Sequence, residues 1–288
     1  QGGGGYEPVD ANVKVNANTW HRVVLAFDLA SGLYEKYVVG VYHSKQNNGG
    51  LDGRQSAKDT IWLFNDNDGE NGEAYVSAIQ IRNGKLSEEE IEDLGPAEAT
   101  GISIPQGAEA IRGLWSFDNG DLGASIGSSL EYLDGPDGAT AGATEFGTTD
   151  SFELPGIQGE SAAVMKVGYV GANANFGYLM KHGIAPNGGG NRVNQYSLVY
   201  DVYFSGGGNG WPSLANLDTS GDGDVFWRRN DGGLGQGGGG YEPLDPGVKV
   251  NVNTWHRVVL AFDLASGLYE KYVDGVYHSK QNNGGLDG

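Results

Sequence analysis

The chain has 288 residues, of which 37 are acidic and 18 basic, and its formal net charge is −19. An acidic surface of this kind argues against nucleic acid or an anionic membrane as a partner, because both carry the same sign of charge. Cysteine is absent, which excludes disulfides and thiolate metal sites, and no apolar run reaches the roughly 20 residues of a membrane span. The 51 glycines, 15 tyrosines and six tryptophans favour an all-β fold with glycine-rich turns.

The sequence of residues 1–53 is repeated almost unchanged as residues 236–288. Gln1 corresponds to Gln236, which sets a period of 235 residues, the size of a whole domain with its linker. The repeat is either an isolated partial duplication or a window on a longer tandem array, and we favour the array. The two copies differ at five positions, which are Val9/Leu244, Ala11/Pro246, Asn12/Gly247, Ala17/Val252 and Val39/Asp274.

Strand signals dominate along the chain. Runs of β-branched and aromatic residues predict strands at 20–27, 33–38, 60–64, 74–82, 113–117, 162–169, 195–204, 225–228 and 255–262. One helix is predicted from Ser87 to about Gly95, because Ser87 and Glu90 form a capping box and the acidic first turn suits the positive end of a helix. Residues 96–110 (PAEATGISIPQGAEA) show no periodicity and are predicted to be an interdomain linker.

A tight hairpin is predicted at Asp274-Gly275, which lies between two strand-like segments. The first copy has Val39 in place of Asp274. A β-branched residue resists the positive φ of a type I′ turn, so we expect this turn to be less favourable, or of another type, in the first copy.

Four stretches resemble laminin-G-like (LamG) domains of the concanavalin A-like lectin/glucanase superfamily. They are LWSFD (114–118), NTWHRV (253–258), YVDG (272–275), and VSAIQI (76–81) followed by LSEEEI (86–91). Their order spans almost the whole period. The resemblance implies an antiparallel two-sheet jelly-roll sandwich with one short C-terminal helix per domain.

The resemblance also implies that the given sequence covers parts of two successive domains rather than one whole domain. Residues 1–95 would be the C-terminal part of one domain, 96–110 the linker, and 111–288 the N-terminal part of the next. Each part alone leaves open sheet edges. Either residues 54–95 complete residues 111–288 within one chain, or a neighbouring copy completes each part head to tail, which would build a filament. We favour the second arrangement, whether the copies are joined covalently or by strand exchange.

Two acidic loops are candidate calcium sites, because carboxylate and amide oxygens on turns are the ligands that calcium prefers. The first is NDNDGENGE (65–73), which lies where the related pentraxins carry an acidic loop. The second is DTSGDGD (218–224). A solvated turn is the alternative for each loop. The candidate ligands are Asp66, Asp68, Glu70, Glu73, Asp218, Asp222 and Asp224.

Catalysis is not expected. The superfamily's glucanases carry a Glu-x-Asp-x-x-Glu strand that places two carboxylates across the scissile bond, and this chain has no such strand. His21 and His256 follow a tryptophan on a strand and are interpreted as structural. His182 is an isolated loop residue.

Sugar binding is a separate hypothesis, since exposed aromatic rings form stacking platforms in lectins. Trp211 lies in a glycine-rich loop and is the candidate ligand-binding residue, with packing under its own loop as the alternative. The tryptophans at positions 20, 62, 115, 227 and 255 lie on predicted strands and are expected in the core.

The sequence therefore predicts a non-enzymatic extracellular or cell-surface protein that forms a fibre, filament, sheath or adhesive stalk from LamG-like domains. Its expected partners are neighbouring copies of itself, and glycans are further candidates, whereas nucleic acid and membrane insertion are not expected. The alternative is a calcium-dependent carbohydrate-binding module, as part of a larger enzyme or on its own.

Overall fold

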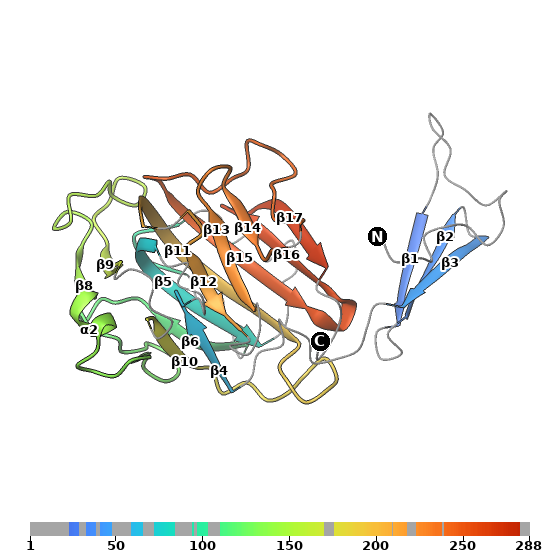
Figure 1. Cartoon of the computed structure of the whole chain (residues 1–288), viewed down its shortest axis with the longest axis horizontal. Helices are drawn as coiled ribbons and strands as arrows, with labels where there is room; N and C mark the ends of the chain where they lie inside the picture. Colours follow the sequence, from blue (N-terminus) through green and yellow to red (C-terminus); the bar gives the residue numbers. More distant parts are fainter. Residues whose placement is uncertain are drawn as a thin grey trace.

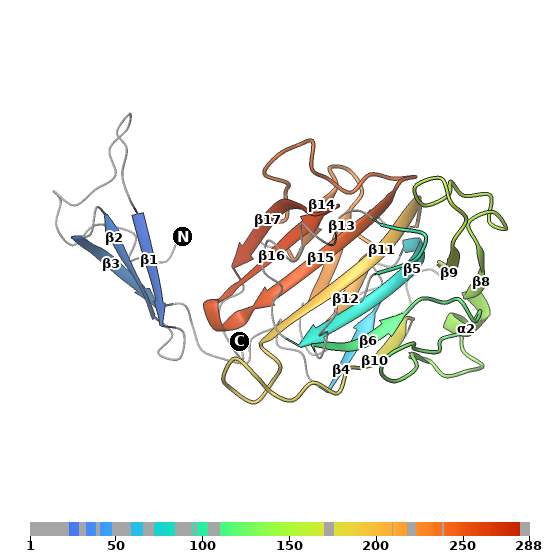
Figure 2. The ribbon, with the colours of Figure 1, turned by 180° about the vertical axis from the view of Figure 1, so that it is seen from behind.

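A computed structural model of the chain shows two antiparallel sheets packed face to face as a β-sandwich (Figures 1 and 2). The structure describes residues 23–28, 33–38, 41–47, 59–65, 72–83, 94, 97–102, 110–169, 176–208, 210–217, 223–237 and 239–282. The all-β sandwich expected from composition and strand pattern is confirmed. Within the described residues, no helix is long and apolar enough to cross a membrane.

The larger sheet has eight strands in the order β17-β16-β15-β11-β5-β9-β8, with β6 also paired to β5. Its strands are β5 (Gly72–Asn83), β6 (Ile111–Trp115), β8 (Glu145–Thr148), β9 (Ala163–Val167), β11 (Gln195–Gly208), β15 (Trp255–Asp263), β16 (Leu268–Val273) and β17 (Val276–Asn282). The long strand β11 lies near the middle, where β5 pairs with one of its edges and β15 with the other.

The smaller sheet has six strands in the order β14-β13-β12-β4-β10-β7. Its strands are β4 (Thr60–Leu63), β7 (Glu131–Tyr132), β10 (Tyr178–Lys181), β12 (Ser213–Asn216), β13 (Asp224–Arg228) and β14 (Gly233–Gly235). A short helix, α2 (Ala139–Ala143), and a 3-10 turn, η1 (Leu264–Ser266), complete the described elements.

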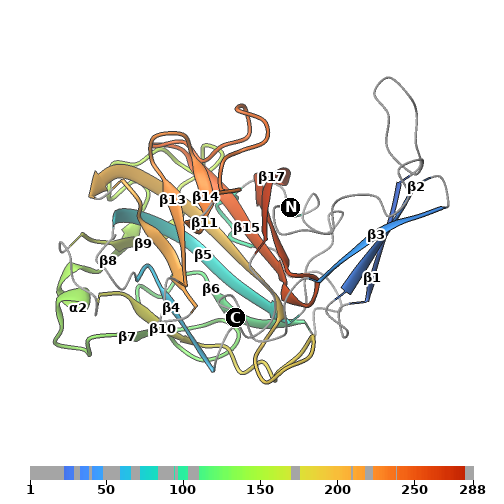
Figure 3. The same ribbon diagram turned by 45° about the vertical axis from the view of Figure 1, so that its right-hand side comes forward.

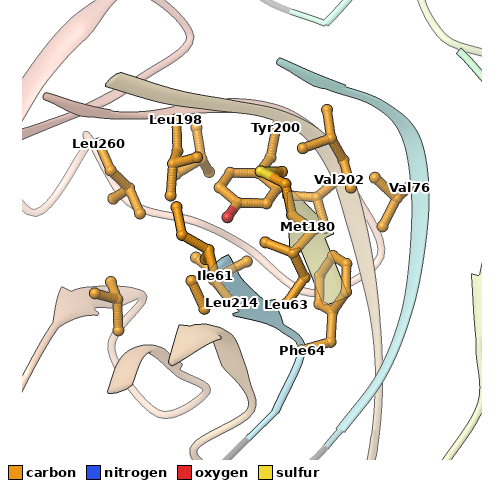
Figure 4. Packing of buried hydrophobic residues seen from close by; sticks show 14 of the residues in the cluster. Ile61, Leu63, Phe64, Val76, Met180, Leu198, Tyr200, Val202, Leu214 and Leu260 are labelled. Carbon is orange, nitrogen blue, oxygen red and sulfur yellow. The ribbon is translucent and has the colours of Figure 1, made fainter. Parts of the chain in front are cut away.

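The core fills the space between the two sheets (Figure 4). Ile61 and Leu63 of β4 are fully buried against side chains of β11 and β15, which include Leu198, Tyr200 and Leu260. Because side chains alternate along a strand, one face of each sheet supplies the core and the other faces outward. Strand β4 is therefore an integral part of the sandwich.

Strands β1 (Val23–Asp28), β2 (Leu33–Val38) and β3 (Val41–Asn47) form a three-stranded sheet of their own (Figure 3). Its pairing repeats that of β15, β16 and β17 with each residue number lowered by 235. Val23 opposes Val38 as Val258 opposes Val273, and the irregularity after Lys36 recurs after Lys271. The same strand pairing therefore occurs in both copies.

Strands from residues 60–83 pair with strands from residues 111–216 within the one chain. Strand β4 pairs with β10 and β12, and β5 pairs with β6, β9 and β11. Part of the expected linker also packs against this sandwich, because Ala97 and Ile102 are buried. Whether the chain spans parts of two successive domains stays a prediction.

Every strand predicted from the sequence has a counterpart among the described elements. The predicted turn at residues 274 and 275 is confirmed, with φ of 53° at Asp274 and 81° at Gly275. Of the predicted helix at 87–95, only Leu94 is described, and it is helical. Val39 and Gly40 lie outside the described residues, so the expected difference between the two turns is not tested.

Replacement of Ile61 by Ala should destabilise the sandwich by about 2–5 kcal/mol, because the side chain is fully buried between the sheets. Urea unfolding followed by tryptophan fluorescence measures the loss. Val276→Ala is the control, since this side chain is 53% exposed. Equal stability of the two variants would show that β4 does not belong to the core.

Candidate functional site

The outward face of the smaller sheet carries a polar and aromatic surface. Val225 and Trp227 of β13 point into the core, so alternation places Asp224, Phe226 and Arg228 on the opposite face. Two features lie along this face, an aromatic–arginine cluster around Trp211 and a buried polar corner at Asn216. Both involve residues that the sequence marked as candidate sites.

The Trp211 cluster consists of Trp211, Phe226, Arg228, Asp231 and Tyr241. The Trp211 ring meets Phe226 edge to face at 4.7 Å between centroids, and Tyr241 at 6.0 Å. The Arg228 guanidinium carbon lies 5.2 Å from the centroid of Trp211 and 4.5 Å from that of Tyr241. Cation–π attraction therefore adds to the packing of the rings.

Hydrogen bonds fix the guanidinium of Arg228 in this position. Its Nε donates to Asp231 Oδ1 at 2.8 Å, its Nη2 forms an ion pair with Asp231 Oδ2, and its Nη1 donates to the Tyr241 hydroxyl at 2.9 Å. Trp211 remains partly exposed. The cluster is thus a preorganised surface with a partly open indole, and the ligand role of Trp211 stays a prediction.

The polar corner forms where β4, β12 and β13 meet. Asn216, at the end of β12, opposes Asp224, at the start of β13. Its Nδ2 donates to Asn65 Oδ1 at 3.4 Å, and Asn65 Nδ2 donates to the Phe176 carbonyl at 2.8 Å. Asn65, Asn216 and Asp224 are all buried. Asn216 Oδ1 has no hydrogen-bond partner among the described residues.

The two predicted acidic loops start from this corner. The chain leaves it at Asn65 for residues 66–71, and it leaves again after Asn216 to return at Asp224. Asp66, Asp68, Glu70, Asp218 and Asp222 lie outside the described residues. The sequence could not show that the two loops start next to each other, because residues 65 and 216 are brought together only by the pairing of β4 with β12.

The two described members of the predicted ligand sets lie on different sheets. Glu73 is on β5, where its Oε1 accepts a hydrogen bond from the Ser205 hydroxyl at 2.7 Å. Asp224 is on β13 of the smaller sheet. No group of three or more His, Asp or Glu side chains suited to a metal ion is found within the described part of the chain.

A buried ion pair joins β11, β15 and the segment before β6. The guanidinium of Arg257 donates from Nε to Asp201 Oδ1 at 2.7 Å and from Nη2 to Asp201 Oδ2 at 2.8 Å, and both side chains are almost completely buried. It also donates to the carbonyls of Leu94 and Gly101. Burial raises the pKa of Asp201, whereas the hydrogen bonds and charge of Arg257 lower it. This pair could not be predicted from the sequence, because its members are 56 residues apart and meet only through the pairing of β11 with β15.

Asp274 supports the neighbouring strand as well as the turn. Its Oδ1 accepts the Arg257 backbone N–H at 2.8 Å, and its Oδ2 lies 2.7 Å from His256 Nδ1. His256 Nε2 accepts the Asn251 backbone N–H at 3.1 Å, so the ring proton sits on Nδ1 and is donated to the carboxylate. His256 therefore holds β15 to the turn, which agrees with its interpretation as a structural residue.

The described part of the loop after Gln236 lies against a buried lysine. The Lys271 ammonium donates to the Gly240 carbonyl at 2.8 Å and to Gln281 Oε1 at 3.1 Å. The Gln281 amide donates to the carbonyls of Gln236 and Gly239 at 2.6 and 2.8 Å. Burial lowers the pKa of Lys271 to about 7. In the second copy, residues 236, 237, 239 and 240 of the QGGGG motif are thus part of a loop of the sandwich.

His182 and His278 also make hydrogen bonds within the sandwich. His182 Nδ1 accepts the Ile184 N–H at 3.0 Å. It lines a pocket of about 360 Å³ together with Asp59, Thr60, Lys181, Gly183 and Ile184. His278 lies 2.7 Å from the Ser279 hydroxyl and 3.2 Å from the Gly232 carbonyl.

The chain matches no protein-family model, no curated protein and no solved structure. The fold is compatible with a jelly-roll sandwich.

The sandwich should lose stability on acidification through the window between pH 6.5 and about 4. Burial lowers the pKa of His278 from 6.5 to about 4. The unfolded chain therefore binds a proton at this residue in a window where the folded chain does not, which costs about 3 kcal/mol of unfolding free energy at the acid end.

Thermal unfolding across this pH range measures the effect in the parent chain and in His278→Asn, whose pH slope should be shallower. His43→Asn alters the same residue of the first copy and is the matched control. Parallel pH slopes in all three proteins would contradict the assignment.

Proposed function

We propose that this chain is a non-enzymatic, extracellular or cell-surface structural protein, in which LamG-like sandwiches follow one another as a fibre, sheath or adhesive stalk. The observation that carries the proposal is the second, nearly identical set of hairpins, β1–β2–β3. It has the strand pairing of β15–β16–β17 but lies outside the sandwich that this chain completes. An array that has the same contact between each pair of successive copies requires a repeat of whole-domain size.

The differences between the two copies support a shared structural role. In the second copy, Leu244, Pro246, Gly247 and Val252 are all exposed. The buried residues that hold β15–β17 together, including Lys271 and Gln281, have identical counterparts in the first copy. The repeat therefore preserves a packing unit and varies only on its surface, apart from position 274.

Extension of the chain by one more period, residues 54–288 added after Gly288, tests this proposal. Negative-stain electron microscopy should then show one additional globule in line with the first, because each period supplies one further set of sandwich strands. A single enlarged globule, or an aggregate without serial globules, would refute the array.

Calcium-dependent carbohydrate binding is the second candidate, supported by the polar corner and the Trp211 cluster on one face. The two acidic loops start next to each other and would supply oxygen ligands from both, and the buried Asn216 Oδ1 adds an acceptor that has no hydrogen-bond partner among the described residues. A partly exposed indole and an ordered guanidinium provide stacking and hydrogen-bonding groups for a sugar.

Addition of calcium should raise the melting temperature, and chelation should reverse the rise, if the corner binds the ion. Asn216→Leu should abolish the calcium-dependent rise. Trp211→Ala should remove glycan binding on an array without unfolding the chain, with Trp62→Ala on the neighbouring strand β4 as the control. Unchanged melting temperatures in calcium, together with no bound glycan, would eliminate this candidate.

A further inference from the structure

An amine and an amide meet inside the sandwich at the β16–β17 hairpin. Lys271 of β16 is 0% exposed and Gln281 of β17 is 5% exposed. The Lys271 nitrogen lies 3.1 Å from Gln281 Oε1. Because a carbonyl bond is about 1.2 Å long, this nitrogen lies within about 4.3 Å of the amide carbon. A nucleophile attacks from a separation of about 3–3.5 Å, so a small movement of the lysine reaches it.

The hydrogen bonds of Lys271 run to neutral groups. Its ammonium donates to the Gly240 carbonyl at 2.8 Å and to Gln281 Oε1, and it lies 4.9 Å from the ring centroid of Tyr269. The ion pairs of the described residues do not include Lys271. Burial lowers its pKa to about 7, against the opposing charge of Glu242. The neutral amine, which is the nucleophilic form, is therefore well populated near neutral pH.

Two further donors polarise the carbonyl of Gln281. The Tyr269 hydroxyl donates to Oε1 at 2.6 Å, and the Gln236 backbone N–H donates to it at 3.0 Å. Burial, and then the charge of Asp224, raise the pKa of Tyr269, so this hydroxyl keeps its proton. The two donors are arranged as in an oxyanion hole, which stabilises negative charge on a carbonyl oxygen during attack.

The surrounding backbone holds the amide in place. Gln281 Nε2 donates to the carbonyls of Gln236 and Gly239 at 2.6 and 2.8 Å, which fixes the plane of the amide. A Cβ at Gly235 would overlap Gln281 Oε1 and would lie 3.1 Å from the Lys271 nitrogen. The φ of Gly235 is 141°, a value that suits glycine. The absence of a side chain at this position therefore leaves the room that the two groups occupy.

We propose that Lys271 and Gln281 become joined by an intramolecular isopeptide bond, which forms by transamidation within the folded sandwich. The neutral Lys271 nitrogen attacks Cδ of Gln281 and forms the new C–N bond, while the carbonyl electron pair moves to Oε1. A proton passes from the attacking nitrogen to Nε2. The carbonyl then re-forms, the Cδ–Nε2 bond breaks, and ammonia leaves.

The atoms balance without an oxidant, a reductant or a further reactant, because one amine and one amide give one amide and ammonia. The product also removes the cost of burying an ammonium, since a neutral amide replaces the charge of Lys271. The bond forms inside one sandwich, so it goes beyond the proposed function and does not depend on it.

Peptide mapping of the purified full chain tests the bond. Trypsin cuts after lysine and arginine, and an acylated lysine is not cut. With Lys271 free, the denatured chain gives peptides 258–271, 272–280 and 281–288. The bond should instead leave 258–280 intact and joined to 281–288, with the loss of one ammonia. The linked product contains both peptides, which distinguishes it from cyclisation of an N-terminal glutamine, a reaction that also releases ammonia.

The digest also separates the two copies of the repeat. The peptide of the first copy that corresponds to 281–288 covers residues 46–54 and ends in Arg54, so its mass is different.

Lys271→Met should abolish the linked product and keep the fold, because methionine fills a similar volume without charge. Lys280→Met is the matched control. Lys280 is exposed and precedes Gln281, so this variant should keep the loss of ammonia within peptide 258–288. Circular dichroism and melting temperature show that each variant is folded.

Tyr269→Phe tests the role of the hydroxyl. It keeps the ring that stacks on Phe262 but removes one donor to Oε1, and it should slow bond formation by about 100-fold. Samples taken at intervals after cell-free synthesis measure this rate. A rate equal to that of the parent chain would remove Tyr269 from the mechanism.

Two outcomes overturn the bond itself. In one, the folded parent chain, held at a pH above the Lys271 pKa of about 7, still gives peptides 271 and 281 as free termini of unlinked 258–271 and 281–288. In the other, Lys271→Met still gives a linked peptide, which would assign the amine to a different lysine. Both readouts are independent of the extended-chain and calcium experiments, since neither of those depends on a cross-link.

Discussion

The sandwich depends on both backbone edges of β11 being paired at once. Strand β5 comes from the N-terminal part of the chain and β15 from its C-terminal part, and each satisfies one edge. The buried pair between Asp201 of β11 and Arg257 of β15 strengthens this junction. Burying such a pair costs solvation energy, but its members are costly to separate once they are buried. Leu94 and Gly101 complete the shell of acceptors, so the segment before β6 is tied to the same point.

The internal repeat supplies two nearly identical sets of hairpins, of which β15–β16–β17 is joined to the larger sheet through the pairing of β15 with β11. The two copies differ at Asp274, whose carboxylate lies in the turn and accepts hydrogen bonds from the neighbouring strand β15. The other four differences lie on the surface of the second copy, where they leave the packing of the hairpins unchanged.

Much of the fold could be predicted because its long strands carry local signals. Local sequence alone identifies β11 and β15 as strands, from their β-branched runs, and Asp274-Gly275 as a turn. Strands such as β7, β12 and β14 have two to four residues, and pairing with neighbours rather than local propensity defines them. The candidate site could be predicted only in part from the sequence, for the same reason. Trp211 stood out by its loop, whereas Arg228 and Asn216 acquire their roles from strands that are distant in the sequence.

The order of β1, β11 and β15 along the chain also sets the order in which they appear during synthesis. Ribosomes add about 5–20 residues per second and release the N-terminal part first. Strand β1 has therefore left the ribosome when β11 emerges, and β15 follows several seconds later. The edge of β11 that pairs with β15 therefore waits several seconds for its partner, whereas β5, which precedes β11 in the chain, is already present for the other edge.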